Sequence, residues 1–184
     1  MAIVMENNYA LWGLTLYPET DEVLEQEPNG LEYFKAENYE ESNVGIISGF
    51  FNPLHSGHIK YMEAAYYERD SLIVIVNNDL QVKLKGSQPF MDEKERLLIV
   101  SGIKWVDKVV LACDKDISVC QSLRVLSGLL PKCKLSFLKG GDRVLENIPE
   151  VAVCEELGIK MFFNVGGEKT QSSSALLGKL KKDF

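Results

Sequence analysis

From residue 43 onward, short uninterrupted apolar runs alternate with longer segments in which apolar residues recur every three or four positions. Uninterrupted runs are typical of strands buried on both faces of a parallel sheet, and the second pattern is typical of helices that cover such a sheet. We therefore expect strands over residues 44–50, 71–76, 107–112, 134–141 and 160–167. We expect helices over residues 56–68, 92–103, 116–130, 148–159 and 171–182. This alternation predicts an α/β fold, a doubly wound parallel sheet of about five strands with helices on both faces.

Residues 1–42 do not follow this alternation. They hold ten of the 27 acidic residues and a single basic residue, Lys35, so the net charge of −7 arises in this segment. An apolar run over residues 9–17 could form one extra strand, and it needs cover from the domain or from a second subunit. We interpret residues 1–42 as an acidic N-terminal extension and residues 43–184 as one domain.

The composition narrows the classes of function. Residues 43–184 carry 17 acidic and 19 basic residues, and the basic residues form no stripe of the kind that binds nucleic acid. No apolar run approaches the roughly 18 residues of a membrane span. The N-terminus lacks the basic start of a signal peptide, so a cytoplasmic location is expected. The four cysteines form no CxxC pair and have no histidine nearby, which favours reduced thiols over a metal site.

Both histidines of the chain lie in one stretch, GFFNPLHSGH over residues 49–58, between the first predicted strand and the first predicted helix. Ligands of doubly wound sheets bind at the carboxyl ends of the strands, where this stretch is expected to lie. Gly49 would let the backbone approach a ligand closely, and the start of the helix would direct N–H groups at an anion. His55 and His58 are three residues apart and can face the same point. The stretch therefore predicts a cradle for charge that develops on a phosphate.

Two other interpretations of the histidine pair stand beside this one. The imidazoles could be hydrogen-bonded structural side chains, or they could bind a metal ion. We favour the phosphate cradle because both imidazoles share one turn that contains glycine and proline, and no third metal ligand is evident nearby. No metal site made by the protein is predicted.

The stretch GFFNPLHSGH resembles the HxGH signature of the cytidylyltransferase-like nucleotidyltransferases. This superfamily includes glycerol-3-phosphate cytidylyltransferase, heptose-1-phosphate adenylyltransferase and nicotinamide mononucleotide adenylyltransferase. The resemblance implies a Rossmann-like nucleotidyltransferase domain over residues 43–184. The cytidylyltransferase branch usually has aspartate where this chain has Asn52, and the spelling FNPxH is closer to the pyridine-nucleotide branch. The stretch thus indicates the superfamily rather than the substrate.

Three further stretches resemble the family in the same order along the chain. Within VNNDLQVKLKGSQPFMDEKERLLI, the family's acid, lysine and helical arginine fall on Asp79, Lys85 and Arg96, which the resemblance places near the triphosphate. Considered without the family, Lys85 lies on a glycine-containing loop and could close over phosphates or stay a solvated surface lysine. Arg96 would be an ordinary exposed helix arginine.

The other two stretches are FLKGGD, over residues 137–142, and QSSSALL, over residues 171–177. The first resembles the heptose-type enzymes more than the GDD of the glycerol type. The second resembles the family's phosphate-binding Ser/Thr motif, although its hydroxyls could simply cap the helix. The glycerol type has an arginine ahead of this motif, whereas this chain has Gly167 there and only Lys169 nearby, which disfavours CTP.

The resemblance implies transfer of a nucleoside monophosphate from ATP or CTP to a phosphorylated sugar or polyol, with release of pyrophosphate. Its implied catalytic residues are His55, His58 and Lys85. Its implied nucleotide-binding residues are Gly49, Phe50, Phe51, Asn52, Gly57, Asp79, Arg96, Lys139, Gly140, Gly141, Asp142, Gln171, Ser172 and Ser173. Mg²⁺ would be held mainly by the nucleotide, and the family suggests a homodimer.

Three alternatives stay open at this point. A pyridine-nucleotide adenylyltransferase is favoured by the FNPxH spelling alone. A nucleotide-binding regulator without turnover is disfavoured because His55, His58, Lys85 and Ser172 are all present. An assembly subunit that interacts through the acidic extension is disfavoured to a similar degree. Release of pyrophosphate separates these readings.

Overall fold

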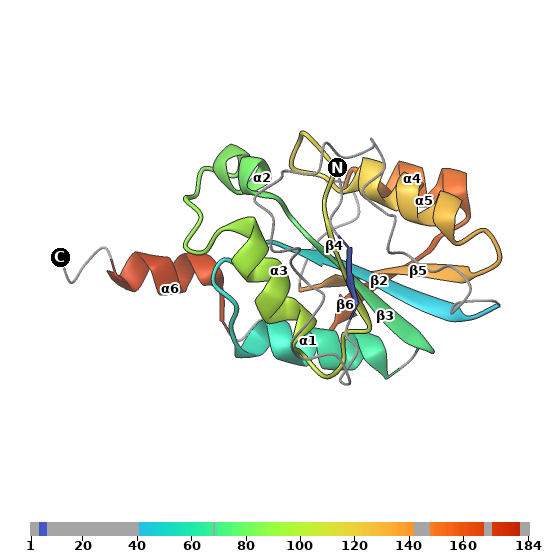
Figure 1. The fold of residues 1–184 in the computed structure, drawn as a ribbon, viewed down its shortest axis with the longest axis horizontal. Coiled ribbons are helices and arrows are strands. Elements are labelled where there is room, and N and C mark those ends of the chain that lie inside the picture. The colour runs from blue at the N-terminus through green and yellow to red at the C-terminus, as the bar shows by residue number, and fades with distance from the viewer. Residues whose placement is uncertain (1–3, 7–40, 68, 142–147, 168–170, 181–184) are drawn as a thin grey trace, which may run out of the picture.

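A computed structural model describes residues 4–6, 41–67, 69–141, 148–167 and 171–180 (Figure 1). One sheet with the strand order β1-β4-β3-β2-β5-β6 forms its centre. β1 pairs antiparallel with β4, and every other neighbouring pair is parallel. The strands are β1 (Val4–Glu6), β2 (Asn43–Gly49), β3 (Ser71–Val76), β4 (Lys108–Leu111), β5 (Lys134–Gly140) and β6 (Lys160–Val165). Five parallel strands lie where apolar runs predicted them, which confirms the predicted fold class.

Helices cover both faces of the sheet. α1 and α3 lie on one face, and α4 and α5 lie on the other (Figure 1). The helices are α1 (Ser56–Tyr66), α2 (Asp79–Leu84), α3 (Glu93–Ser101), α4 (Cys120–Leu129), α5 (Glu150–Leu157) and α6 (Ser173–Leu180). α6 projects away from the sheet at the side where the carboxyl ends of the strands lie (Figure 1).

The hydrophobic core is divided in two by the sheet. Alternate residues of the central strands point to opposite faces, so Ile46 packs with α4 and α5 while Ile47 packs with α1 and α3. All six residues of β3 are buried, as expected for a strand covered on both faces. Each fully buried aliphatic side chain contributes about 1.5–3 kcal/mol, so this double core holds the carboxyl ends of the strands in place.

Several element boundaries differ from the predicted ones because local hydrogen bonds decide them. The helix expected from residue 116 begins only at Cys120, because the carboxylate of Asp114 accepts hydrogen bonds from the backbone N–H groups of Gln121 and Ser122. The helix expected through residue 159 ends at Leu157, and Gly158 follows it in the left-handed conformation at φ 67°. At α3 the predicted N-terminal acid is present, since Asp92 accepts from Glu95 N.

Two elements are additional to the prediction. β1 belongs to the acidic segment 1–42 and adds an edge strand to the sheet, beside β4. The apolar run at residues 9–17, where an extra strand was expected, lies outside the described residues. α2 is only six residues long and is capped by Asn78, whose side chain accepts from Gln81 N. Both elements are too short to give a periodic pattern.

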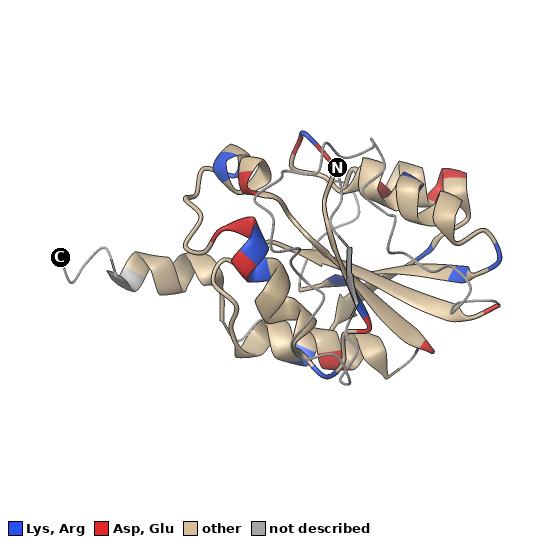
Figure 2. Ribbon diagram, in the orientation of Figure 1, with Lys and Arg blue, Asp and Glu red and all other residues tan. Residues whose placement is uncertain are grey.

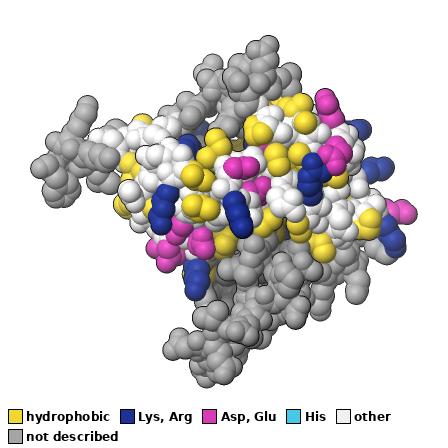
Figure 3. Space-filling model, turned by 90° about the horizontal axis from the view of Figure 1, so that it is seen from above, with side chains coloured by type: hydrophobic (Ala, Val, Ile, Leu, Met, Phe, Trp, Pro, Cys, Tyr) yellow, Lys and Arg dark blue, Asp and Glu magenta, His cyan; other side chains and the backbone are white. Residues whose placement is uncertain are grey.

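Charged residues of both signs are interspersed over the helices and the strand ends (Figure 2). On the face seen in Figure 3, the described basic side chains are separated by acidic and hydrophobic ones rather than joined in a stripe. Among the described helices, none has the length and apolar character that crossing a bilayer requires.

Candidate active site

A cleft of about 290 Å³ opens at the carboxyl ends of β2 and β5. These two strands are neighbours, but the chain leaves them in opposite directions, through α1 to β3 and through α5 to β6. Such a reversal of strand order creates a crevice where doubly wound sheets bind ligands. Residues of the turn after β2, of α1, of the β5 end and of the α6 start line the cleft. The topology therefore brings stretches that are far apart in sequence to one site.

The turn after β2 is fixed by its own packing. Phe51 has a positive φ of 47°, and its buried ring lies directly against Gly49. A Cβ atom at Gly49 would lie 2.6 Å from that ring, so no larger residue fits there. Gly57 likewise makes room for the His55 ring, which would lie 3.1 Å from an added Cβ. Gly49 lines the cleft, where we expected the backbone to approach a ligand, and its lack of a side chain also leaves room for the Phe51 ring.

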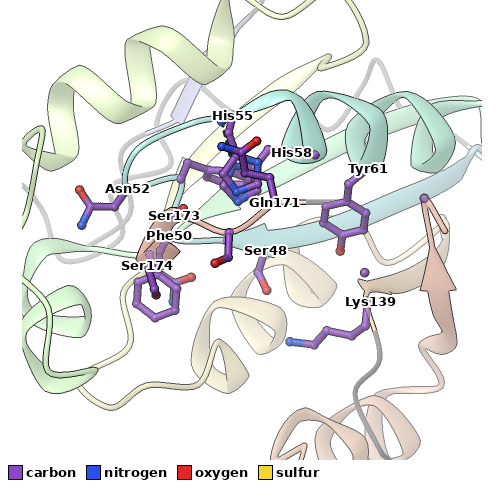
Figure 4. Close-up of a pocket in the computed structure, with 18 of the residues that line it drawn as sticks. Ser48, Phe50, Asn52, His55, His58, Tyr61, Lys139, Gln171, Ser173 and Ser174 are labelled. Carbon is purple, nitrogen blue, oxygen red and sulfur yellow. Dashed lines mark hydrogen bonds between the residues drawn. The ribbon is translucent and has the colours of Figure 1, made fainter. Parts of the chain in front are cut away.

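His55 and His58 lie together at the start of α1, at the top of the site in Figure 4. Their rings are stacked with centroids 3.7 Å apart and an angle of 19° between the ring planes. The backbone N–H of His55 donates to Nδ1 of His58 over 3.2 Å. In the neutral imidazole, an accepting Nδ1 places the ring proton on Nε2. His58 is thus held as an Nε2–H donor in the first turn of α1.

Asn52 ties this turn to the loop that precedes α3. Its side-chain amide donates to the carbonyl of Gln88 over 2.8 Å, and its carbonyl accepts from Phe90 N over 2.6 Å. Asn52 borders the cleft but is only 4% exposed. It is therefore a structural link between two walls of the cleft, and an amide suits this link because it both donates and accepts.

Asp79 and Arg96 do not line the cleft. The guanidinium of Arg96 is fully buried and donates to the carbonyls of Phe50, Asn77 and Met91 at 2.7–3.2 Å. It also forms an ion pair of 2.6 Å with Asp79. The alternative of an exposed helix arginine is therefore wrong. Arg96 holds the ends of β2 and β3 from beneath the turn.

Lys85 lies at the C-terminal end of α2 and borders the cleft. Its side chain is exposed, and its ammonium stacks on the ring of Phe50, 4.2 Å from the ring centroid. Gly86 follows with a φ of 76°, which a glycine adopts readily. The structure thus places Lys85 at the mouth of the cleft, next to the turn that carries the histidines.

Lys139, Gly140 and Gly141 line the opposite wall, at the end of β5. In Figure 4 the Lys139 side chain extends from β5 across the part of the pocket opposite the two histidines. Its ammonium lies 3.4 Å from Oε1 of Glu150, the first residue of α5. Asp142, also predicted as a site residue, lies outside the described residues.

Gln171, Ser172 and Ser173 all line the cleft at the start of α6. The Ser172 hydroxyl accepts from Ala175 N over 3.1 Å and so caps the helix. The Ser173 hydroxyl donates to the carbonyl of Pro53 over 2.9 Å, which joins α6 to the histidine turn. The predicted phosphate-binding motif therefore also positions its own helix against the turn.

Tyr61 and Glu150 are among the described cleft residues that the sequence analysis did not predict. Tyr61, one turn after His58, donates its hydroxyl to the carbonyl of Leu138 over 2.5 Å and packs against Gly140. Glu150 sits in the cleft wall at 4% exposure. Tyr61 could have been found, because it shares the helix face of His58. Glu150 gave no such signal, because acids are common in the first turn of any helix.

Within the described part of the chain, no three His, Cys, Asp or Glu side chains gather as a metal-binding group. Mg²⁺ carried by a nucleotide stays a prediction.

The chain is similar in sequence to a known protein family and to several known proteins. A family model described as cytidylyltransferase-like matches residues 46–172. The chain is 32% identical over 142 residues to the bifunctional protein HldE of Bradyrhizobium sp. (strain ORS 278), with 76% of the chain and 27% of that relative covered. It is 34% identical over 140 residues to the HldE protein of Geotalea uraniireducens (strain Rf4), with 74% and 27% covered. The chain thus spans about a quarter of the length of these relatives.

Two solved structures share the fold. One is a lipopolysaccharide core biosynthesis protein from Thermoplasma volcanium GSS1, with a TM-score of 0.51, 24% identity, and coverage of 66% of this chain and 93% of that one. The other is a bifunctional NMN adenylyltransferase/ADP ribose pyrophosphatase from Francisella tularensis, with a TM-score of 0.50, 13% identity, and coverage of 78% and 43%. At these identities the likeness concerns the fold alone.

Proposed function

The chain belongs to the cytidylyltransferase-like family, and on that premise we propose that it transfers a nucleoside monophosphate from ATP or CTP to a phosphorylated sugar or polyol and releases pyrophosphate. The observation that carries this proposal is the His55–His58 pair, stacked at the start of α1 in the cleft between β2 and β5. The pair faces a cleft whose wall also carries Lys85 and Lys139. Polyphosphate ligands require such a collection of donors and positive charge.

The reaction needs positioning and neutralisation of charge rather than a protein nucleophile. A phosphate oxygen of the acceptor attacks the α-phosphorus, and the bond to the pyrophosphate oxygen breaks in line with the attack. Negative charge builds on the oxygens of the α-phosphate during this step. The Nε2–H of His58, fixed by the hydrogen bond at its Nδ1, is our donor to those oxygens. Removal of one such donor typically lowers kcat by about 100- to 1,000-fold.

The triphosphate is proposed to extend from the histidines toward the start of α6. The N–H groups of a helix start favour an anion, and Gln171, Ser172 and Ser173 bring that start into the cleft. Lys85, which rests on Phe50 at the mouth, can reach the β- and γ-phosphates from its exposed position. When bound with the nucleotide, Mg²⁺ would neutralise part of the charge of the phosphates. Since the described residues offer no carboxylate cluster, the nucleotide itself would be the main ligand of that ion.

The class of acceptor is proposed from the relatives and from one motif. The HldE proteins are more than 30% identical to this chain over about three quarters of its length, and the stretch FLKGGD resembles the heptose type more than the glycerol type. Both favour a sugar phosphate over nicotinamide mononucleotide. We also propose a homodimer, which light scattering on the whole chain tests.

A screen for pyrophosphate release tests the proposed function. ATP, CTP, UTP and GTP are each paired with sugar phosphates, polyol phosphates and nicotinamide mononucleotide, and the His58→Ala protein is the matched control. Release with a sugar or polyol phosphate that depends on His58 would support the proposal. Release with nicotinamide mononucleotide alone would favour the pyridine-nucleotide reading. A wild-type protein that releases no pyrophosphate with any pair would favour a regulator or an assembly subunit.

A further inference from the structure

A buried ion pair lies in the wall of the cleft, and the mechanism above does not use its acid. Lys139 is 8% exposed and Glu150 is 4% exposed, and the Lys139 ammonium is 3.4 Å from Oε1 of Glu150. Among the described residues that line the cleft, Glu150 is the only carboxylate. A carboxylate in a cleft for phosphates repels its ligands unless a cation neutralises it. A carboxylate at this position is therefore expected to have a structural or functional role.

The contacts of Glu150 indicate that role. The same oxygen that faces Lys139 accepts a hydrogen bond of 3.2 Å from the backbone N–H of Val119, the residue that precedes α4. One carboxylate thus joins the end of β5, the start of α4 and the start of α5. Lys139, Glu150 and Val119 all line the cleft. Glu150 therefore connects three elements of the cleft wall, on the face of the sheet that α4 and α5 cover.

Of the three described lysines that line this cleft, Lys85 and Lys139 differ in how strongly their side chains are held. Lys85 is exposed at the mouth and rests on the ring of Phe50. Lys139 is almost wholly buried, and its ammonium is held between Glu150 and the ring of Phe137, whose centroid is 4.6 Å away. A lysine side chain that is already ordered loses little further conformational entropy when it binds an anion. Lys139 is therefore suited to recognise a phosphate group at a fixed point.

We propose that Glu150 is a positioning residue that holds the ammonium of Lys139 in the cleft, so that it contacts a phosphate group of a bound ligand. This inference rests on the proposed function, because it assumes a phosphorylated ligand. The phosphate can belong to the nucleoside triphosphate or to the acceptor. Glu150 acts through Lys139 and does not touch the ligand itself.

A double-mutant cycle on the whole chain tests the coupling. The variants are Glu150→Gln, Lys139→Met and the double variant. Glutamine keeps an oxygen that can accept from Val119 N, so the start of α4 retains its link while the charge is removed. The matched controls are Lys134→Met, at the other end of β5, and Glu155→Gln, on the exposed side of α5. Thermal unfolding of every variant shows which of them are folded.

The readouts are calorimetric affinities for two probes and the steady-state constants for pyrophosphate release. Inorganic tripolyphosphate represents the triphosphate, and inorganic phosphate represents the acceptor group. We expect each single variant to weaken binding of at least one probe by about ten-fold, as loss of one charged contact does. The double variant should bind no more weakly than Lys139→Met, because both changes remove the same contact. The probe that is affected identifies the ligand whose phosphate Lys139 contacts.

Two results would overturn the role of Glu150. One is wild-type affinity for both probes in the folded Glu150→Gln protein. The other is a double variant whose loss equals the product of the two single losses, because Glu150 would then act independently of Lys139. The titrations do not require turnover. A wild-type protein that binds the probes, shows the coupling and releases no pyrophosphate would therefore refute the proposed function and keep the role of Glu150.

Discussion

Two buried cations, Arg96 and Lys139, lie near the same cleft and serve different ends. Arg96 is fully buried below the histidine turn and donates to three backbone carbonyls and to Asp79. Lys139 lies at the end of β5, in the wall of the cleft, beside Glu150. The guanidinium of Arg96 is directed at the protein, and the ammonium of Lys139 is directed at the cleft.

The difference follows from the chemistry of the two side chains. A guanidinium is planar and presents five N–H donors, so it can join several fixed carbonyls at once. An ammonium on a flexible stem acts as a point charge, which suits a ligand that comes and goes. A buried cation near a cleft is therefore not by itself a ligand-binding residue. Arg96 donates to backbone carbonyls and does not line the cleft, whereas Lys139 is part of the cleft wall.

The largest effect is expected at Arg96. Replacement of Arg96 by Met leaves the carbonyls of Phe50 and Asn77 without their donor and Asp79 without its partner. Each buried carbonyl left without a donor costs about 1–3 kcal/mol of unfolding free energy, and loss of the ion pair with Asp79, whose side chain is 27% exposed, adds less. Urea denaturation of the variant measures it. Arg124→Met, which removes an ion pair with Glu156 on the surface, is the matched control and should change stability far less. Equal midpoints for the two variants would refute the structural role of Arg96.

The next largest effect is expected on catalysis, at His58. His58→Ala removes the Nε2–H donor, so kcat should fall by about 100- to 1,000-fold. His58 is half-buried at the edge of the sheet rather than in the core, so the urea midpoint should stay close to that of the wild type. Steady-state kinetics of pyrophosphate release measure the loss of catalysis, and urea denaturation of the same preparation measures any loss of stability. Full activity in the folded variant would remove His58 from the mechanism.

A smaller effect is expected for Lys85, an exposed lysine at the cleft. Lys85→Ala removes one positive charge from the mouth of the cleft. Nucleotide affinity should fall by about ten-fold, because loss of one charged contact has an effect of this size. Lys83→Ala, on the same helix and also exposed, is the matched control. Titration with ATP measures both. If Lys83→Ala and Lys85→Ala weaken ATP binding equally, Lys85 makes no specific contact with the nucleotide and contributes only long-range attraction.

Much of the fold could be predicted because buried parallel strands appear in the sequence as uninterrupted apolar runs. The six consecutive apolar or small residues of β3 are an example, and all of them are buried. β1 could not be predicted, because three residues carry no periodicity and its pairing with β4 is decided by the edge that β4 leaves open. α2 was missed for a similar reason, since only Gln81 and Val82 of its six residues are buried.

The candidate site was predictable where one local stretch carries the chemistry. His55, His58 and the start of α6 all reach the cleft, because each follows directly from a strand or begins a helix at the same edge. The burial of Arg96 could not be read from the sequence, because it depends on carbonyls at the ends of two strands. Glu150 depends in the same way on Lys139 and Val119, which only the folded chain brings together.

The smallest effect concerns Cys154, on the first turns of α5 near the ion pair. Burial is the main cause that raises the pKa of its thiol to about 11, and the charge of Glu150 raises it further. The charge of Lys139 lowers this pKa by a smaller amount. The folded state therefore favours the protonated thiol, and the thiolate becomes common only as the pH rises toward that value. Alkylation at pH 8 should modify Cys154 more slowly than the partly exposed Cys113, and equally fast in urea. Mass spectrometry of the two peptides measures the rates, and rapid modification of Cys154 in the folded protein would contradict the burial of this region.

The most direct test of the central claim follows the phosphorus atoms of the nucleotide. The protein is incubated with ATP labelled either at the α-phosphorus or at the γ-phosphorus, together with the acceptor that supports pyrophosphate release. Nucleotidyl transfer puts the α label in the organic product and the γ label in pyrophosphate, and the His58→Ala protein should slow both. Appearance of the γ label in the organic product would show a phosphoryl transfer instead and would contradict this account of the cleft.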